Sequence, residues 1–378
     1  MQENSGPQLP YGTEPPGPVH QPWRAGSPES APQPPAPAAP PYGAPPYPAP
    51  AAPPYGAPPY PAHPGHPAYG APLPQPVSWF APTPSGAHYD HLARTPLARP
   101  WRQIVGTLVV ALGFLVVGVV VVLAGSVFAT IAGLPMPITA DESFGDPVFG
   151  MAVLLLSIAA VLPLVFGTAA LVQQRRPGTL SSVAGRLRWP WLLTCAGVAV
   201  LALVLGQAAQ AVALMLSGED TSDMFGWAGW REFVPALIVI VLLVPFQAAA
   251  EEYIFRGWVL QALGAHVRNP AWAIVLGAAL FASLHGYTGA GLFDVFAFGA
   301  VMGWLAVRTG GLEAPIALHV VNNMMAFGLS AAAGQLDDAL RQGAVPWQAL
   351  AGTVVQLGVF AGGVLYLAKK RSISVISG

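Results

Sequence analysis

The sequence predicts an all-α fold, a polytopic membrane helical bundle of about eight transmembrane helices preceded by a disordered proline-rich tail. Of its 378 residues, 54% are hydrophobic and only 9% are charged, against roughly 25% charged residues in a soluble domain. Long apolar runs recur through residues 101–371, whereas 31 of the 42 prolines fall in the first hundred residues. The net charge of −1 provides no field that would attract nucleic acid.

Residues 1–100 form the predicted tail, which is rich in Pro, Ala, Gly and Tyr. The segment 38–49 recurs without change at 51–62. Such a segment lacks the aliphatic bulk for a core, and its prolines block both helix and sheet. We expect a cytoplasmic spacer with a preference for polyproline II, the alternative being a docking strip for a WW- or SH3-like partner. A chain that begins near Leu92 is expected to keep the chemistry.

The membrane domain is predicted at 101–371, followed by a short C-terminal tail at 372–378. A spanning helix needs about 20 mostly apolar residues. The first four runs meet this length, the fifth to seventh are short and contain glycine, and the eighth is again long. In order, the predicted spans are 103–134, 148–172, 191–216, 233–255, 271–285, 293–307, 315–329 and 347–367.

The distribution of charge between the loops orients these spans. Basic residues precede the first span, fill the connection after the second, and follow the fourth, sixth and eighth. Acidic residues occupy the opposite loops. Because basic loops face the cytoplasm, we expect a multi-pass protein of the cell membrane with both termini cytoplasmic, as an even number of spans requires. The basic residues are Arg94, Arg99, Arg102, Arg175, Arg176, Arg186, Arg188, Arg268, Arg308, Lys369, Lys370 and Arg371.

Two adjacent glutamates, Glu251 and Glu252, lie late in the fourth apolar run. A charged side chain at membrane depth costs roughly 2.5–3.5 kcal/mol, and adjacent carboxylates repel, so one is expected to hold a proton. Glu252 and Arg256 are four residues apart, share a helix face and can form an ion pair, which would keep Glu252 ionised and leave Glu251 to titrate. An ion pair accounts for only one of the two carboxylates, so the pair of glutamates indicates a functional site.

Two further polar clusters follow. Phe281 and His285 share one helix face, as do His319 and Asn323. Taken alone, a membrane His or Asn is more often an interhelical hydrogen-bonding residue than a catalyst. Together with the glutamates, these side chains supply a base, two imidazoles and an amide, which can activate water and stabilise an oxyanion. The single cysteine, Cys195, lies in an apolar run and is expected to serve packing.

The three motifs, Glu-Glu-x-x-x-Arg at 251–256, Phe-x-x-x-His at 281–285 and His-x-x-x-Asn at 319–323, occur in an order that resembles the CPBP family. That family includes the CAAX prenyl endopeptidases and bacteriocin-processing or self-immunity proteins. The resemblance covers roughly residues 190–335. It implies an intramembrane endopeptidase that cleaves a peptide bond near the cytoplasmic membrane face.

The resemblance also implies roles for single residues. Glu251 would be the catalytic glutamate, Glu252 and Arg256 would complete its motif, and His285 would help to activate water. His319 and Asn323 would stabilise the oxyanion.

The family has long been described as metalloproteases, but this donor set does not require zinc, and we expect no cofactor. If zinc is present, Glu251, His285 and His319 form an acceptable set of ligands.

Two other functions stay open. A non-catalytic membrane interaction or immunity protein of the same fold would tolerate the loss of Glu251. A proton-coupled transporter could use Glu251 and the histidines as a relay, although the sequence shows no inverted repeats with broken helices. The Lys-poor, Ala-, Gly-, Pro- and Arg-rich composition is typical of a high-GC bacterium, so a peptide or membrane-protein substrate is expected rather than a prenylated tail.

The depths of the motif residues do not agree in this prediction. At about 1.5 Å of rise per residue, Glu251 falls near the cytoplasmic end of the fourth span. Counted from Pro270, His285 falls roughly 20 Å deep. The fifth helix would have to begin in the cytoplasm or be strongly tilted.

Overall fold

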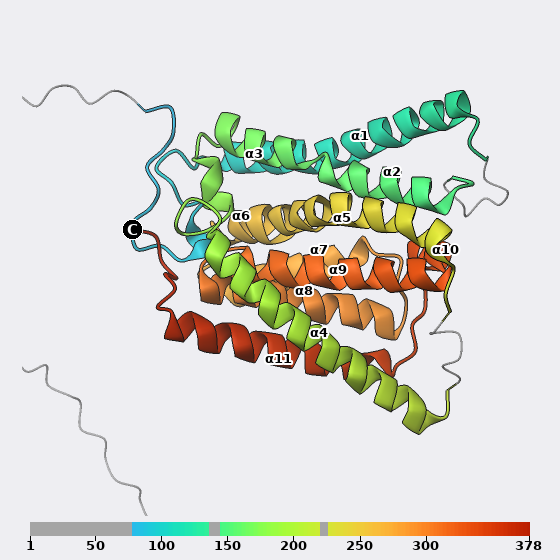
Figure 1. Cartoon of the computed structure of the whole chain (residues 1–378). Helices are drawn as coiled ribbons and strands as arrows, with labels where there is room; N and C mark the ends of the chain where they lie inside the picture. The colour runs from blue at the N-terminus through green and yellow to red at the C-terminus, as the bar shows by residue number, and fades with distance from the viewer. Residues whose placement is uncertain (1–77, 136–143, 220–225) are drawn as a thin grey trace, which may run out of the picture. The chain divides into compact units, whose positions relative to one another are not determined.

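The computed structural model of the chain describes residues 78–135, 144–219 and 226–378 (Figure 1). Most of the predicted tail, at 1–77, therefore lies outside the described residues. In the described part, β-structure is limited to isolated bridges. The helices are η1 (Tyr89–His91), α1 (Pro100–Ala132), α2 (Pro147–Ala159), α3 (Leu162–Leu171), η2 (Pro177–Leu180), α4 (Trp189–Ser217), α5 (Trp230–Glu252), the π-helix η4 (Tyr253–Val259), α6 (Leu260–Gly264), α7 (Pro270–Ser283), α8 (Ala290–Thr309), α9 (Glu313–Ala333), α10 (Leu336–Arg341) and α11 (Ala349–Lys370).

The all-α membrane bundle predicted from the sequence is confirmed. Among the described residues, seven segments are long and apolar enough to cross a membrane, with α2 and α3 forming one of them. The fifth predicted span is α7, whose 14 residues rise only about 21 Å, less than the roughly 30 Å of a bilayer core. The protein is therefore a multi-pass membrane protein with seven candidate spans and one shorter apolar helix.

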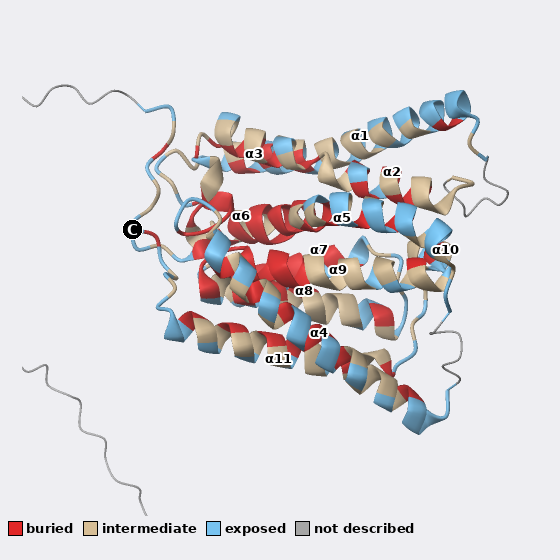
Figure 2. Ribbon diagram, viewed as in Figure 1, coloured by how far each residue is buried: buried red, intermediate tan, exposed pale blue. Residues whose placement is uncertain are grey.

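Burial is concentrated around the segment from α5 to α6 and its neighbours α7, α8 and α9 (Figure 2). By contrast, only 6% of the most apolar window of α1 is buried. A helix that is apolar on all sides and remains largely uncovered is suited to contact lipid. The polar motifs thus lie on the inner helices, where protein side chains surround them.

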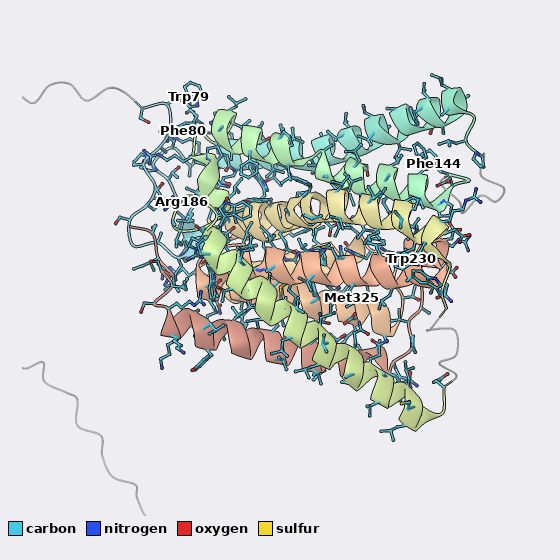
Figure 3. All side chains as sticks on the ribbon, viewed as in Figure 1. Trp79, Phe80, Phe144, Arg186, Trp230 and Met325 are labelled. Carbon is cyan, nitrogen blue, oxygen red and sulfur yellow. The ribbon has the colours of Figure 1, made fainter. Side chains whose placement is uncertain are left out.

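Tryptophans that are more than half exposed lie at both ends of the bundle. Trp101 and Trp189 lie at the starts of α1 and α4, and Trp227 and Trp230 lie at the start of α5. Trp79 and Trp230 lie at opposite ends of the bundle (Figure 3). Tryptophan is enriched where a membrane meets water, because its ring is apolar and its N–H is polar. The two groups indicate the two interfaces of the membrane-crossing part.

The predicted end of the fourth span at residue 255 is wrong. The helix continues from α5 through η4 into α6 as one segment, Trp230–Gly264, of 35 residues. Charges at 251–256 look like a helix end in the sequence, but they are buried and paired inside the bundle. Glu251 therefore lies 13 residues before Gly264, roughly 20 Å along the helix. Since α7 starts shortly after α6, His285 and Glu251 lie at similar depths, which removes the mismatch.

Residues 78–99 were assigned to the tail, yet they contact the membrane domain. Tyr89 and Leu92 are fully buried, and the Tyr89 hydroxyl donates to the carbonyl of Leu180. The indole N–H of Trp79 donates to the carbonyl of Ala170 at 3.0 Å (Figure 3). The boundary between tail and membrane domain therefore lies earlier than residue 100.

The C-terminal tail at 372–378 joins the same region. The backbone N–H of Ser377 donates to the carbonyl of Ala87 at 2.9 Å, and the N–H of Gly86 donates to the carbonyl of Ser377 at 2.9 Å. The segment before α1 and the C-terminus thus lie together at one end of the bundle. That this end faces the cytoplasm stays a prediction.

Candidate active site

The first motif lies where α5 passes into the π-helix η4. Glu252 is fully buried, and Glu251 and Arg256 are 9% and 3% exposed. The guanidinium of Arg256 donates through Nη1 to Glu252 Oε1 at 2.8 Å, which is the ion pair expected from the spacing. π-Helical turns are rare in proteins, and those that occur are often found at functional sites. Here the π-helix starts directly after the two glutamates.

His319, from α9, lies between the two carboxylates. Its Nδ1 is 2.7 Å from Glu252 Oε1, and its Nε2 is 3.5 Å from Glu251 Oε2. Because Glu252 is ion-paired with Arg256, it accepts the Nδ1–H of His319. That hydrogen bond fixes the ring so that Nε2 faces Glu251, in the way that a buried carboxylate orients the histidine of a catalytic triad.

Asn323, one turn further along α9, reaches the site through Gln247. Its Nδ2 donates to Gln247 Oε1 at 3.1 Å, and Gln247 Nε2 donates to Glu251 Oε1 at 2.7 Å. Gln247 is 4% exposed. The sequence analysis missed this residue, although a polar amide one turn before Glu251 on an apolar helix was the available signal.

Phe281, near the end of α7, connects the second motif to the others. The Arg256 guanidinium lies over its ring, 4.2 Å from the centroid, as in a cation–π contact. The Phe281 ring centroid lies 4.5 Å from that of His285 and 6.1 Å from that of His319. Both motif histidines therefore flank one phenylalanine, which is 2% exposed.

His285 follows the last turn of α7 and is partly exposed. Its Nδ1 lies 2.8 Å from the carbonyl oxygen of Phe281, to which it donates. The other ring nitrogen, Nε2, is therefore available to bind a water molecule or a substrate. Among the described residues, His285 has no hydrogen bond or ion pair with Glu251. The structure thus joins five of the six predicted site residues through polar contacts and places the sixth beside them through Phe281.

The centre of this site keeps polar atoms that form no hydrogen bond within the described residues. These are Glu251 Oε2, Glu252 Oε2 and Arg256 Nη2, all of them buried. Buried polar atoms are usually paired, because leaving them unpaired is costly. A cluster that served packing alone would not be expected to keep three such atoms.

The side chains do not fit a zinc centre. In the part of the chain that the structure describes, no group of three His, Cys, Asp or Glu side chains converges so that it could hold a metal ion. The set Glu251, His285 and His319 therefore does not assemble as a group of ligands in the described residues.

The comparisons with known proteins support one family. A family model, type II CAAX prenyl endopeptidase Rce1-like, matches residues 231–325, which run from α5 into α9 and include all three motifs. The uncharacterized protein YyaK of Bacillus subtilis (strain 168) is 26% identical over 233 residues, which are 59% of this chain and 76% of that protein. No solved structure gives a significant match. The match includes all three motifs and confirms the resemblance to the CPBP family that they indicated.

Proposed function

We propose that the protein is an intramembrane endopeptidase in which Glu251 activates a water molecule for hydrolysis of a peptide bond. The observation that carries this proposal is the buried contact of Glu251 with His319 and Gln247, inside the segment that matches the endopeptidase family. A base, an imidazole and an amide that converge in this way are the parts that hydrolysis of an amide needs.

The two oxygens of Glu251 have different surroundings. Oε1 accepts the hydrogen bond from Gln247, whereas Oε2 has no hydrogen-bond partner among the described residues. We therefore assign Oε2 as the atom that takes the proton from water. The resulting hydroxide attacks the carbonyl carbon, and the proton then passes to the amine as the carbon–nitrogen bond breaks. Nε2 of His285 is proposed to orient the same water.

His319 and Asn323 are proposed to face the oxyanion that forms on the substrate. They lie one turn apart on α9. As an imidazolium, His319 would donate from Nε2 while Glu252 holds Nδ1. Asn323 uses one hydrogen of its NH₂ group for Gln247, and the second is free to donate.

Cleavage is proposed to occur in the half of the membrane nearer the chain termini. Glu251 lies 21 residues after Trp230 and 13 residues before Gly264, or roughly 31 Å and 20 Å of helix rise. Arg94 donates to the carbonyl of Gly264 at 2.7 Å, so the α6 end is the end that holds residues 78–99. The substrate class is a peptide or a membrane protein, and a prenylated tail is not required.

The test compares membrane peptides by mass spectrometry in cells that carry wild-type protein or Glu251→Gln. The amide keeps the shape of the side chain but cannot take a proton from water, so cleavage products should disappear. Glu232→Gln is the matched control, since Glu232 lies on the same helix but is exposed. A purified Glu251→Gln protein that cleaves at the wild-type rate would remove Glu251 from the mechanism. Substrate flux in proteoliposomes without cleavage would favour a transporter.

A further inference from the structure

Gln247 connects two of the three motifs, although it belongs to none of them. Its amide group lies between Glu251 on its own helix and Asn323 on α9, at 2.7 Å and 3.1 Å. Both hydrogen bonds are made inside the bundle, where Gln247 is 4% exposed. A buried amide that uses both its N–H and its C=O has only one favourable orientation, which its partners decide.

The carboxylate of Glu251, which the proposed function uses as a base, decides this orientation. A carboxylate only accepts hydrogen bonds, so Gln247 must turn its NH₂ group toward Glu251. Its carbonyl oxygen then faces Asn323, which must present its own NH₂ group. The negative charge on Glu251 therefore fixes the orientation of the Gln247 amide, and the Gln247 amide in turn fixes the orientation of the Asn323 amide.

A neighbouring Gln–Asn pair between helices of this bundle has the opposite arrangement of donor and acceptor. Gln356 on α11 also bonds to an asparagine of α9, at 3.1 Å, but there the glutamine donates and Asn322 accepts through Oδ1. The two Gln–Asn pairs have the same chemistry, adjacent asparagines and equal lengths. They differ in that Gln247 contacts a carboxylate.

We propose that Gln247 is a positioning residue, which holds the amide of Asn323 with its NH₂ group toward the oxyanion of the reaction. This inference rests on the proposed function, in which Glu251 is ionised before catalysis and Asn323 stabilises the transition state. Without Gln247, the amide of Asn323 is free to rotate, and its carbonyl oxygen would then oppose the negative charge. The loss should not exceed that of an oxyanion donor, roughly 10²–10³ in rate.

Cleavage kinetics of three variants test the proposed role of Gln247. The variants are Gln247→Met, Asn323→Ala and the two combined, and methionine keeps the length of the glutamine side chain without its amide. Gln247→Met should lower kcat with little change in KM, because the contact acts in the transition state. In the Asn323→Ala background it should cost less than in the wild type, because only the hydrogen bond to Glu251 is then lost. Gln356→Met is the matched control and should cleave at the wild-type rate. If Gln247→Met costs as much in the Asn323→Ala background as in the wild type, Gln247 does not act through Asn323 and the proposal is wrong.

A second measurement does not depend on cleavage. The chain has four asparagines, Asn4, Asn269, Asn322 and Asn323, so ¹⁵N-asparagine labelling of the protein in detergent gives four side-chain NH₂ signals, and Asn323→Ala identifies one of them. Gln247→Met should move the Asn323 signal and Gln356→Met the Asn322 signal. An Asn323 signal that Gln247→Met leaves in place would overturn the inference. Absence of cleavage by wild-type protein, with the Asn323 signal moved, would instead count against the proposed function.

Discussion

Nδ1 of His319 lies 2.7 Å from Oε1 of Glu252, although the two residues are 67 positions apart in the chain. The same oxygen accepts from Arg256 at 2.8 Å. One fully buried carboxylate therefore connects the π-helix after α5 to α9 and orients the imidazole that faces Glu251. Since both partners are buried as well, we expect Glu252 to serve both charge balance and the orientation of His319, and two variants can separate these roles.

Glu252→Gln is expected to abolish cleavage and to destabilise the protein. The substitution leaves a buried guanidinium without its counter-charge, which costs roughly 3–5 kcal/mol when one partner of a buried ion pair is removed. Thermal unfolding in detergent and cleavage of a peptide substrate measure the two effects. The double variant Glu252→Gln/Arg256→Met removes both charges and should recover much of the stability, but not the activity, because a neutral amide does not stabilise the positive charge proposed for His319. An active double variant would show that the charge of Glu252 is not needed for the reaction.

The sequence was sufficient to predict the membrane bundle and the faces of its motifs. A spacing of four residues places Glu252 and Arg256 on one helix face, and the two side chains pair as expected. The end of the fourth helix could not be predicted, because a local pattern treats Glu251, Glu252 and Arg256 as charges that need water. Their burial also involves contacts with His319, which is distant in the chain.

Long-range contacts also explain the two other omissions. The segment 78–99 has the prolines of the tail, yet Tyr89 is buried by its contact with Leu180, 91 positions away. Gln247 resembles any polar interruption of an apolar helix until Asn323, 76 positions away, is placed against it. Partners of this kind become visible only after the helices are packed.

His285→Ala is expected to reduce cleavage nearly as much as Glu251→Gln, while the protein remains folded. His285 is partly exposed and packs on Phe281, so its loss opens no large cavity, but the proposed water loses its orienting imidazole. His266→Ala is the matched control, because His266 is exposed and lies between α6 and α7. Cleavage rates and unfolding midpoints of the purified variants decide the outcome. Equal losses in both variants would exclude a specific role for His285.

A chain that begins at residue 78 should enter the membrane, unfold at the same temperature and cleave at the same rate as the full-length protein. A chain that begins at residue 100 should be less stable. The longer deletion removes Tyr89 and Leu92, which are fully buried, and each such side chain contributes about 1.5–3 kcal/mol. This changes the expectation for a start near Leu92, since that chain also loses Tyr89. Unfolding in detergent compares the three lengths. Identical midpoints for the two truncated chains would mean that residues 78–99 do not support the fold.

Tyr89 should make stability depend on pH in alkaline solution. Burial raises the pKa of Tyr89 well above its usual value, which is about 10 in an unfolded chain. The folded state therefore holds the phenol neutral. The contribution of Tyr89 to the free energy of unfolding is complete below pH 10 or so and is lost as the pH rises beyond that value. Unfolding midpoints between pH 8 and 11 or so should fall more steeply for the wild type than for Tyr89→Phe. Parallel curves would contradict the assignment.

Purified protein dialysed against a strong chelator is expected to keep its activity. A catalytic zinc ion would need three side-chain ligands at roughly 2.0–2.2 Å and one open position. Glu251 and His319 lie close together, but the described residues supply no group of three His, Cys, Asp or Glu side chains that could hold an ion. Asn323 is a poor zinc ligand, and its NH₂ group is instead suited to donate to an oxyanion. The measurement is cleavage before and after dialysis, with elemental analysis of the same sample. Inactivation that stoichiometric zinc reverses, together with bound metal, would replace the glutamate-activated water by a metal-bound one.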